Sequence, residues 1–147
     1  MSAQQTVVDL MAKGMNVLHR SLLSVSGGRI GATAKGMHVV QLHTTGRMSG
    51  QRRSVMLTCP IYETDRVVLI ASKGGDDRHP DWYRNLVALP DVELTDGGTT
   101  RLMRARTASP AEKAEMWPAI VAANKGYEGY QQRTDRDIPV VVCEPRG

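Results

Sequence analysis

The feature of this sequence that most constrains its fold is a series of six short segments with the composition of β-strands. These segments are rich in β-branched and apolar residues, and they cover residues 37–44, 53–59, 66–72, 91–95, 99–107 and 138–143. The third contains an unbroken apolar run, Val67-Val68-Leu69-Ile70-Ala71, which is typical of a strand buried on both faces. Most connections are too short for a β-α-β crossover, which predicts a mainly antiparallel sheet. Six strands in a chain of 147 residues favour a small barrel, because closure removes exposed strand edges.

Two helical patterns lie in the first part of the chain. Apolar residues recur at three- and four-residue steps over residues 4–25, and Gly27-Gly28 ends this helix, so residues 1–28 form an N-terminal helical segment. Pro80 to Ala88 has the pattern of a short helix that begins at proline. Because the sequence contains no repeat or linker, we expect one α+β domain over residues 1–147.

Two more helices are expected in the last third. Ser109-Pro110-Ala111-Glu112 is a strong helix start, with serine as the N-cap, proline at the first position and glutamate at the third. Pro118 should bend or interrupt this helix. A second, short helix is expected from Tyr127 to Gln132.

Composition excludes several classes of protein. Hydrophobic residues make up 41% of the chain and charged residues 23%, as in a globular domain. The two cysteines, Cys59 and Cys143, form no disulfide framework, which indicates a reducing, cytoplasmic compartment. No apolar run is long enough to span a bilayer, and residues 1–25 lack the apolar core of a signal peptide. The basic N-terminal helix either packs on its own domain or lies on the inner face of the plasma membrane.

Positive charge is concentrated in the first part of the chain. Residues 1–54 hold seven basic residues and one acidic residue, which makes this part +6 and leaves −2 for the remainder of a chain of net charge +4. Such an excess favours an anionic ligand, although a solvated surface explains it equally well. We expect no nucleic-acid partner, because aromatic residues do not alternate with the basic ones and no recognition motif occurs.

The common catalytic motifs are absent from the sequence. It contains no G-x-x-x-x-G-K-[ST] phosphate loop and no G-x-G-x-x-G that opens a helix. It contains neither H-E-x-x-H nor C-x-x-C, and its four histidines are scattered, so no metal site is expected. Cys143 lies in an apolar strand and is expected in the core.

Two glycine loops that carry cations follow strands. The first is Thr44-Thr45-Gly46-Arg47-Met48-Ser49-Gly50-Gln51-Arg52-Arg53, and the second is Ser72-Lys73-Gly74-Gly75. Glycine lets backbone N–H groups form a nest around an anion, and arginine adds a bidentate fork for phosphate or carboxylate. If the two strands adjoin, Arg47, Arg53 and Lys73 converge on one side. The alternative is two ordinary turns with solvated cations.

These loops and a third block resemble one family. The first block is Leu42-His43-Thr44-Thr45-Gly46-Arg47-x-Ser49-Gly50-x-x-Arg53; the second is Ala71-Ser72-Lys73-Gly74-Gly75 with Pro80-x-Trp82-Tyr83-x-Asn85-Leu86 and Pro90; the third is Tyr127-x-x-Tyr130-Gln131-x-x-Thr134-x-Arg136-x-Ile138-Pro139. In order and spacing they resemble the deazaflavin (coenzyme F-420)-dependent nitroreductases and related reductases of actinobacteria. The resemblance covers residues 42–145 and implies a split β-barrel like that of flavin reductases.

The resemblance also implies roles for the residues of the first two blocks. Its cofactor loop, with Lys73, would hold the phosphate and acidic tail of the coenzyme. Ser72 would lie beside the deazaflavin ring, and the backbone of Ile70 and Ala71 would lie nearby. Trp82 and Asn85 would shape the cleft, although Trp82 could equally be a core anchor. Residues assigned to the tail are Arg47, Met48, Ser49, Gly50, Arg53 and Lys73, of which Met48 replaces the lysine common in the family.

The third block is implied to face the substrate. Tyr127 and Tyr130 share one helix face and would line its pocket, although ordinary packing is the alternative. With Ser72, these tyrosines are the candidate catalytic residues, since each could orient the acceptor or relay a proton. Nitroreductases of the family tend to carry a tyrosine near the position of Thr58, which argues against nitroimidazole reduction in particular.

We therefore expect an oxidoreductase that uses reduced coenzyme F-420. The hydride would pass to an electrophilic small molecule: a quinone, an enone or coumarin-like lactone, or a nitro-heterocycle. The alternatives are an FMN-dependent reductase on the same barrel and a non-catalytic module that binds a lipid or a flavin. We expect a monomer or a homodimer.

Overall fold

The computed structural model describes residues 33–34 and 37–146. The predicted N-terminal helix over residues 4–25, and with it the expected membrane contact, lies outside the described residues. Within the described residues, the predicted strands and helices occur in the predicted order. The strands are β1 (Thr33–Ala34), β2 (Met37–Thr45), β3 (Arg52–Cys59), β4 (Ile61–Tyr62), β5 (Val67–Ile70), β6 (Asp91–Asp96), β7 (Thr99–Thr107) and β8 (Val140–Pro145). The helices are the 3-10 helix η2 (Lys73–Gly75), α2 (Asp81–Ala88), α3 (Pro110–Ala123) and α4 (Gly126–Gln132).

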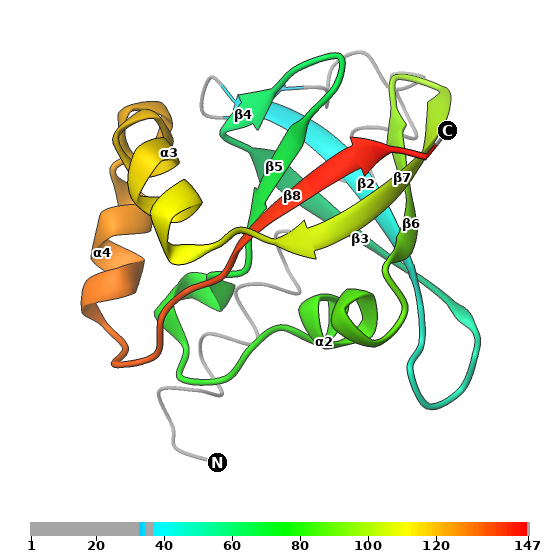
Figure 1. Cartoon of the computed structure of the whole chain (residues 1–147), viewed down its shortest axis with the longest axis horizontal. Coiled ribbons are helices and arrows are strands. Elements are labelled where there is room, and N and C mark those ends of the chain that lie inside the picture. The colour runs from blue at the N-terminus through cyan, green and yellow to red at the C-terminus, as the bar shows by residue number, and fades with distance from the viewer. Residues whose placement is uncertain (1–32, 35–36, 147) are drawn as a thin grey trace.

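The described strands form one curled antiparallel sheet. Its order is β1-β2-β6-β7-β8-β5-β4, and β3 pairs with β2. The curl brings β3 close to β5, although the two strands share no ladder within the described residues. A barrel that is open between two neighbouring strands is a split barrel, so the predicted α+β split barrel is confirmed (Figure 1).

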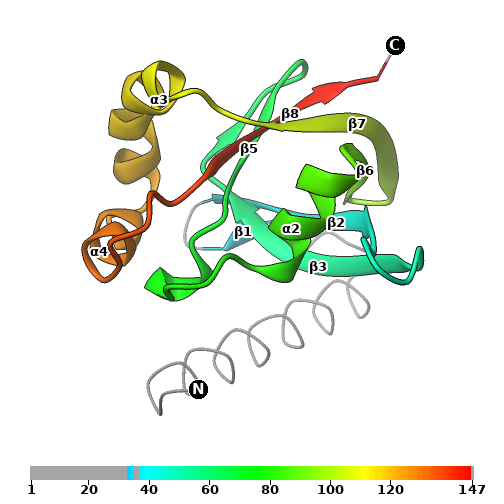
Figure 2. The ribbon, with the colours of Figure 1, turned by 60° about the horizontal axis from the view of Figure 1, so that its bottom comes forward.

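The core has two parts, separated by the sheet. Inside the barrel, Leu42, Leu69 and Met103 pack together with both cysteines, Cys59 and Cys143, which confirms that Cys143 is a core residue. On the outer face of β5 and β8, a second cluster packs against α3 and α4, which lie side by side there in Figures 1 and 2. Strand β5 contributes to both clusters, since alternate side chains point to opposite faces. This explains its unbroken apolar sequence.

Helix α3 differs from the prediction at one residue. Its start has the expected capping box, because the backbone N–H of Glu112 donates to the Ser109 hydroxyl at 3.2 Å and that of Ser109 donates to the Glu112 carboxylate at 2.9 Å. The predicted interruption at Pro118 is wrong, since one helix runs from Pro110 to Ala123, and the alternative of a bend there stays a prediction. Pro118 and Ala114, four residues earlier, are both exposed. Water can therefore solvate the carbonyl that proline leaves without a donor.

Two strands were not predicted. Both β1 and β4 have only two residues, which is too short to show an alternating pattern. Strand β5 also ends at Ile70, two residues earlier than expected, because the chain turns at Ala71 and Ser72 into η2. That turn places the second glycine loop at the end of a buried strand.

Candidate active site

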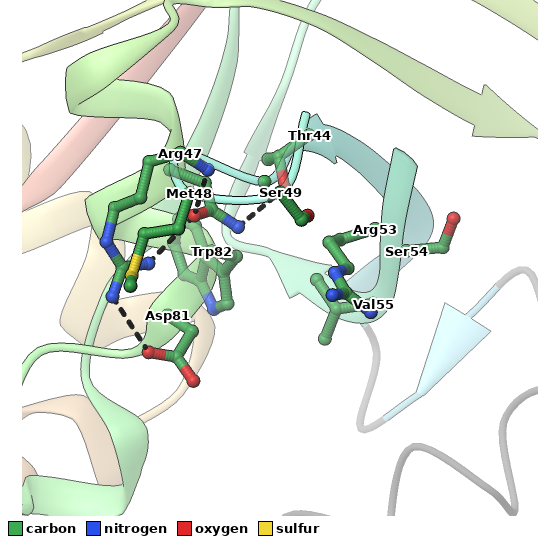
Figure 3. Close-up of a pocket in the computed structure, with 11 residues that line it drawn as sticks. Thr44, Arg47, Met48, Ser49, Arg53, Ser54, Val55, Asp81 and Trp82 are labelled. Carbon is green, nitrogen blue, oxygen red and sulfur yellow. Dashed lines mark hydrogen bonds and ion pairs between the residues drawn. The ribbon is translucent and has the colours of Figure 1, made fainter. Parts of the chain in front are cut away.

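A cleft of about 480 Å³ lies between the β2–β3 loop and α2 (Figure 3). Strands β2 and β3 supply its inner wall and the loop between them supplies the rim, while the first turns of α2 supply the opposite wall. Eleven residues line it: Thr44, Gly46, Arg47, Met48, Ser49, Arg53, Ser54, Val55, Asp81, Trp82 and Asn85. The cleft is thus lined by four of the loop residues assigned to the coenzyme, Arg47, Met48, Ser49 and Arg53, together with Trp82 and Asn85, whereas Gly50 does not line it.

The β2–β3 loop is a tight, internally bonded turn. The Gly46 N–H donates to the Gln51 carbonyl at 2.7 Å, and the Gly50 N–H donates to the Gly46 carbonyl at 2.8 Å. Gly50 has φ 72°, so this position favours glycine, whereas a Cβ on Gly46 would lie 2.6 Å from the Ser49 hydroxyl oxygen and would displace that side chain. The loop thus uses the N–H groups of both glycines itself, and an anion nest in this loop stays a prediction that would depend on its other N–H groups.

Asn85 positions Arg47. The Asn85 side-chain oxygen accepts hydrogen bonds from the Arg47 backbone N–H at 3.2 Å and from its guanidinium at 2.8 Å. The Asn85 amide donates to the Thr44 hydroxyl at 3.3 Å, and Asn85 is buried. The Arg47 guanidinium also lies 3.6 Å from the exposed carboxylate of Asp81. Asn85 therefore fixes one cation at the cleft, where the sequence had predicted only that it shapes the wall.

Arg53 faces the same cleft from β3. Its guanidinium makes no hydrogen bond or ion pair with the described part of the chain, and Figure 3 shows it across the cleft from Arg47. Ser49 is exposed on the loop, and its hydroxyl oxygen accepts a bond from the Gln51 N–H at 3.1 Å. Met48 is 91% exposed at the rim. Two guanidinium groups and a hydroxyl around one cleft suit a ligand that carries phosphate or carboxylate groups.

The second glycine loop does not line this cleft. Ile70 and Ala71 are buried, Ser72 and Lys73 are partly buried, and none of the four lines the cleft. The prediction that Lys73 converges with Arg47 and Arg53 is therefore met only for the two arginines. The loop turns through three residues of positive φ: Lys73 at 46°, Gly74 at 64° and Gly75 at 85°. Sequence reasoning predicted the glycines but not this conformation of Lys73.

The two tyrosines of α4 differ in setting. Their rings meet edge to face with centroids 6.2 Å apart, as the three-residue spacing predicted. Tyr127 is 5% exposed, and its hydroxyl lies 3.0 Å from the Thr58 hydroxyl and 3.7 Å from the Met37 sulfur. Burial raises the pKa of Tyr127, so its phenol stays neutral. This is the setting of a packed side chain, whereas Tyr130 is partly exposed, and the catalytic role of both stays a prediction.

Trp82 is both a wall of the cleft and an anchor in the core, the two alternatives that the sequence left open. It lines the cleft and also packs against the core inside the barrel, beside Tyr83.

The described part of the chain holds no cluster of three or more metal-ligating side chains. It also holds no helix that is long and apolar enough to cross a membrane.

Comparison with known proteins identifies the family. A family model described as F420H(2)-dependent quinone reductase matches residues 17–145. The chain belongs to this family. It is 39% identical over 133 residues to an F420H(2)-dependent quinone reductase of Mycobacterium tuberculosis, which covers 88% of this chain and 89% of that protein. Membership makes the protein an oxidoreductase with coenzyme F-420 as its cofactor, as the sequence motifs predicted.

Solved structures of similar proteins support the same assignment. A structure of an F420-H2-dependent reductase (FDR-A) is 39% identical, with a TM-score of 0.65, and covers 72% of this chain and 93% of that one. A second structure, described as a domain-swapped dimer, is 35% identical, with a TM-score of 0.67, and covers 87% of this chain and 96% of that one. Both share the split barrel, so the family likeness holds in sequence and in fold.

Proposed function

We propose that the protein reduces quinones with reduced coenzyme F-420, and that the cleft between the β2–β3 loop and α2 binds the anionic part of the coenzyme. One observation carries the location: Arg47 and Arg53 line the same cleft, and the Arg53 guanidinium has no partner in the described chain. Quinone is the favoured acceptor because the matching family and the mycobacterial relatives carry that name.

Three side chains would hold the phosphate and acidic tail. Arg53 offers an unengaged bidentate fork. Arg47 is already oriented by Asn85, so less conformational entropy is lost on binding. The Ser49 hydroxyl accepts a bond from the Gln51 N–H, which leaves its own proton free to be donated to the ligand. Lys73 does not line this cleft, and only the family resemblance assigns it to the acidic tail.

The bound coenzyme supplies a hydride in its reduced form. A quinone becomes a hydroquinone when it gains one hydride and one proton, so the chain has to orient the quinone and keep a proton source within reach. Ser72 and Tyr130 are our candidates for that task, because both are partly exposed near the second glycine loop. Tyr127 is less available, since Thr58 and Met37 enclose its hydroxyl.

Binding and turnover test the two halves of the proposal separately. The full chain is titrated with oxidised F-420 and with FMN, and turnover is then followed with a water-soluble quinone, an enone and a nitro-heterocycle. We expect F-420 to bind with a Kd in the micromolar range or tighter, about −8 kcal/mol. FMN should bind more weakly because it lacks the acidic tail. Turnover of the enone or the nitro-heterocycle without quinone turnover would contradict the acceptor, and tight FMN binding without F-420 binding would contradict the coenzyme. A Kd for F-420 that is unchanged in Arg53→Ala would contradict the assigned cleft.

A further inference from the structure

We propose that Arg136 is a positioning residue of the active site, which holds the loop from Ala71 to Asp76 in the conformation that presents Ser72 and Lys73. The inference rests on the proposed function, because only the family resemblance places these two residues beside the coenzyme. Arg136 belongs to the third block of the family resemblance, which implies no role for it.

Arg136 binds both ends of the loop. One terminal nitrogen of its guanidinium donates to the Ala71 carbonyl at 3.2 Å and to the Ser72 carbonyl at 2.9 Å. Its Nε donates to the Asp76 carbonyl at 2.8 Å, and its other terminal nitrogen lies 3.1 Å from Nδ1 of His79. A planar fork with several donors can tie together carbonyls that lie several residues apart along the chain. One side chain from the segment before β8 thus fixes where this loop begins and ends.

The loop requires such support because its backbone is strained. Lys73 has φ 46°, a left-handed conformation that side chains with a Cβ rarely adopt, and it is the one non-glycine residue of positive φ in the described chain. Gly75 also packs directly against the end of α4: a Cβ there would lie 2.9 Å from the Tyr130 carbonyl oxygen and 3.0 Å from Cβ of Arg133. The loop is therefore held both by Arg136 and by its contact with α4.

The charges around the loop support a role in positioning rather than in ion pairing. The carboxylates of Asp76 and Asp77 act on the Arg136 guanidinium electrostatically, but each is hydrogen-bonded elsewhere. Asp76 accepts from the Arg78 guanidinium at 2.8 and 3.0 Å, and Asp77 accepts from the Thr134 hydroxyl at 2.8 Å. The hydrogen-bonding capacity of Arg136 is directed at backbone carbonyls and at His79.

Arg136→Met and Arg136→Lys test the inference, with Lys113→Met as the matched control. Lys113, on α3, is a second partly buried cation that contacts the same segment before β8. It donates to the Ile138 carbonyl at 2.7 Å and to the Gln131 side chain at 3.0 Å, but it has no bond to the loop within the described chain. Both Arg136 variants should raise the Kd of oxidised F-420 at least about tenfold and lower kcat on the order of a hundredfold, because small displacements of positioning groups are costly. Lys113→Met should lower the melting temperature and leave the Kd nearly unchanged.

Amide hydrogen exchange measures how firmly the loop from Ala71 to Asp76 is held, and it needs no ligand. The Gly75 N–H donates to the Ser72 carbonyl at 2.9 Å, and the Asp76 N–H donates to the Lys73 carbonyl at 3.1 Å. These amides should lose protection in both Arg136 variants and keep it in Lys113→Met. If Arg136→Met does not fold, Gly75→Ala displaces the loop from the side of α4 and should raise the Kd in the same way.

The outcomes separate this inference from the proposed function. If the wild-type chain binds F-420 but does not reduce quinone, the acceptor is wrong, and the Kd and exchange measurements still decide the role of Arg136. If folded Arg136→Lys and Gly75→Ala keep both the wild-type Kd and the wild-type exchange of the loop, the inference is overturned.

Discussion

At the scale of single residues, Arg53 and Arg52 form a natural pair for locating the anion site. They are neighbours on β3, but alternate residues of a strand point to opposite faces. Arg53 faces the cleft, whereas the Arg52 guanidinium pairs with Glu93 at 2.5 Å. Arg53→Ala removes a charge-assisted hydrogen bond worth about 1.5–3 kcal/mol, so we expect the Kd of F-420 to rise by about tenfold to somewhat over a hundredfold in calorimetry. Arg52→Ala should leave it nearly unchanged, and equal losses in the two variants would contradict the location.

Asp81 is the opposing charge at the same cleft. Its carboxylate is exposed and lies 3.6 Å from the Arg47 guanidinium, where it competes with an anionic ligand. Exposed ion pairs contribute roughly 0.2–1 kcal/mol. Asp81→Asn should therefore tighten F-420 binding by about two- to fivefold at low salt, with a smaller gain at high salt. Weaker binding in this variant would show instead that Asp81 contacts the ligand directly.

His79 makes the stability of the site region dependent on pH. Burial, then the charges of Arg136 and Arg84, lower the pKa of His79 below its usual value near 6.5. The unfolded chain therefore binds a proton at a pH where the folded chain does not. The contribution of His79 to the free energy of unfolding should be complete above its unfolded pKa, near 6.5, and should be lost as the pH is lowered below that value.

Denaturant titrations at several pH values measure this dependence. His79→Gln, which cannot titrate, should reduce the slope below pH 6.5. Part of the slope should remain, because burial also lowers the pKa of His43. An unchanged slope in His79→Gln would mean that His79 titrates equally in both states.

At the scale of elements, α3 depends on its first turn. The Ser109 hydroxyl and the Glu112 carboxylate satisfy each other's backbone N–H groups, and Glu112 also accepts two bonds from Arg106. Ser109→Ala should lower the free energy of unfolding by about 1 kcal/mol, measured by urea titration. Ser109→Asp should retain most of the stability, because aspartate is an equally good N-cap. A loss in Ser109→Asp as large as in Ser109→Ala would contradict the capping account.

Elements with local signals were predictable from the sequence, and those without were not. The capping box marked the start of α3, and the unbroken apolar run marked β5 as a strand covered on both faces. The interruption predicted at Pro118 was wrong, because the free-energy cost of a proline inside a helix depends on whether the carbonyl that loses its donor can be solvated by water. The sequence does not show this. The two-residue strands β1 and β4 pair only through the tertiary fold and have no pattern of their own.

The candidate site was predictable where its residues are neighbours in the sequence. Arg47, Ser49 and Arg53 belong to one loop, and the structure brings them to one cleft. The role of Asn85 as the partner of Arg47 joins residues 38 positions apart, and Arg136 acts on a loop about 60 positions earlier. Hydrogen bonds of this kind leave no trace in local sequence, so spacing could not reveal them.

At the scale of the whole molecule, the curled sheet explains why distant segments meet. Strand β2 pairs with both β3 and β6, and β5 reaches the same barrel by pairing with β8. The β2–β3 loop and α2, the helix that follows β5 and η2 in the chain, therefore lie on one side of the barrel, where they enclose the cleft (Figures 1 and 3). A ligand held there contacts two segments that belong to different parts of the sheet, so binding should stabilise the fold as a unit.

Thermal unfolding with and without coenzyme tests this coupling. A ligand that binds only the folded chain, present at 100 times its Kd, stabilises it by about 2.7 kcal/mol, which corresponds to roughly 5–10 °C in Tm. We expect oxidised F-420 to raise Tm by this amount at low salt, and less in 0.5 M salt at the same concentration, because screening weakens the attraction between the arginines and the acidic tail. The Tm shift should shrink in Arg53→Ala and persist in Arg52→Ala. A shift insensitive to both salt and Arg53→Ala would mean that the coenzyme is held mainly by contacts to its ring, and that the anionic tail lies outside the cleft.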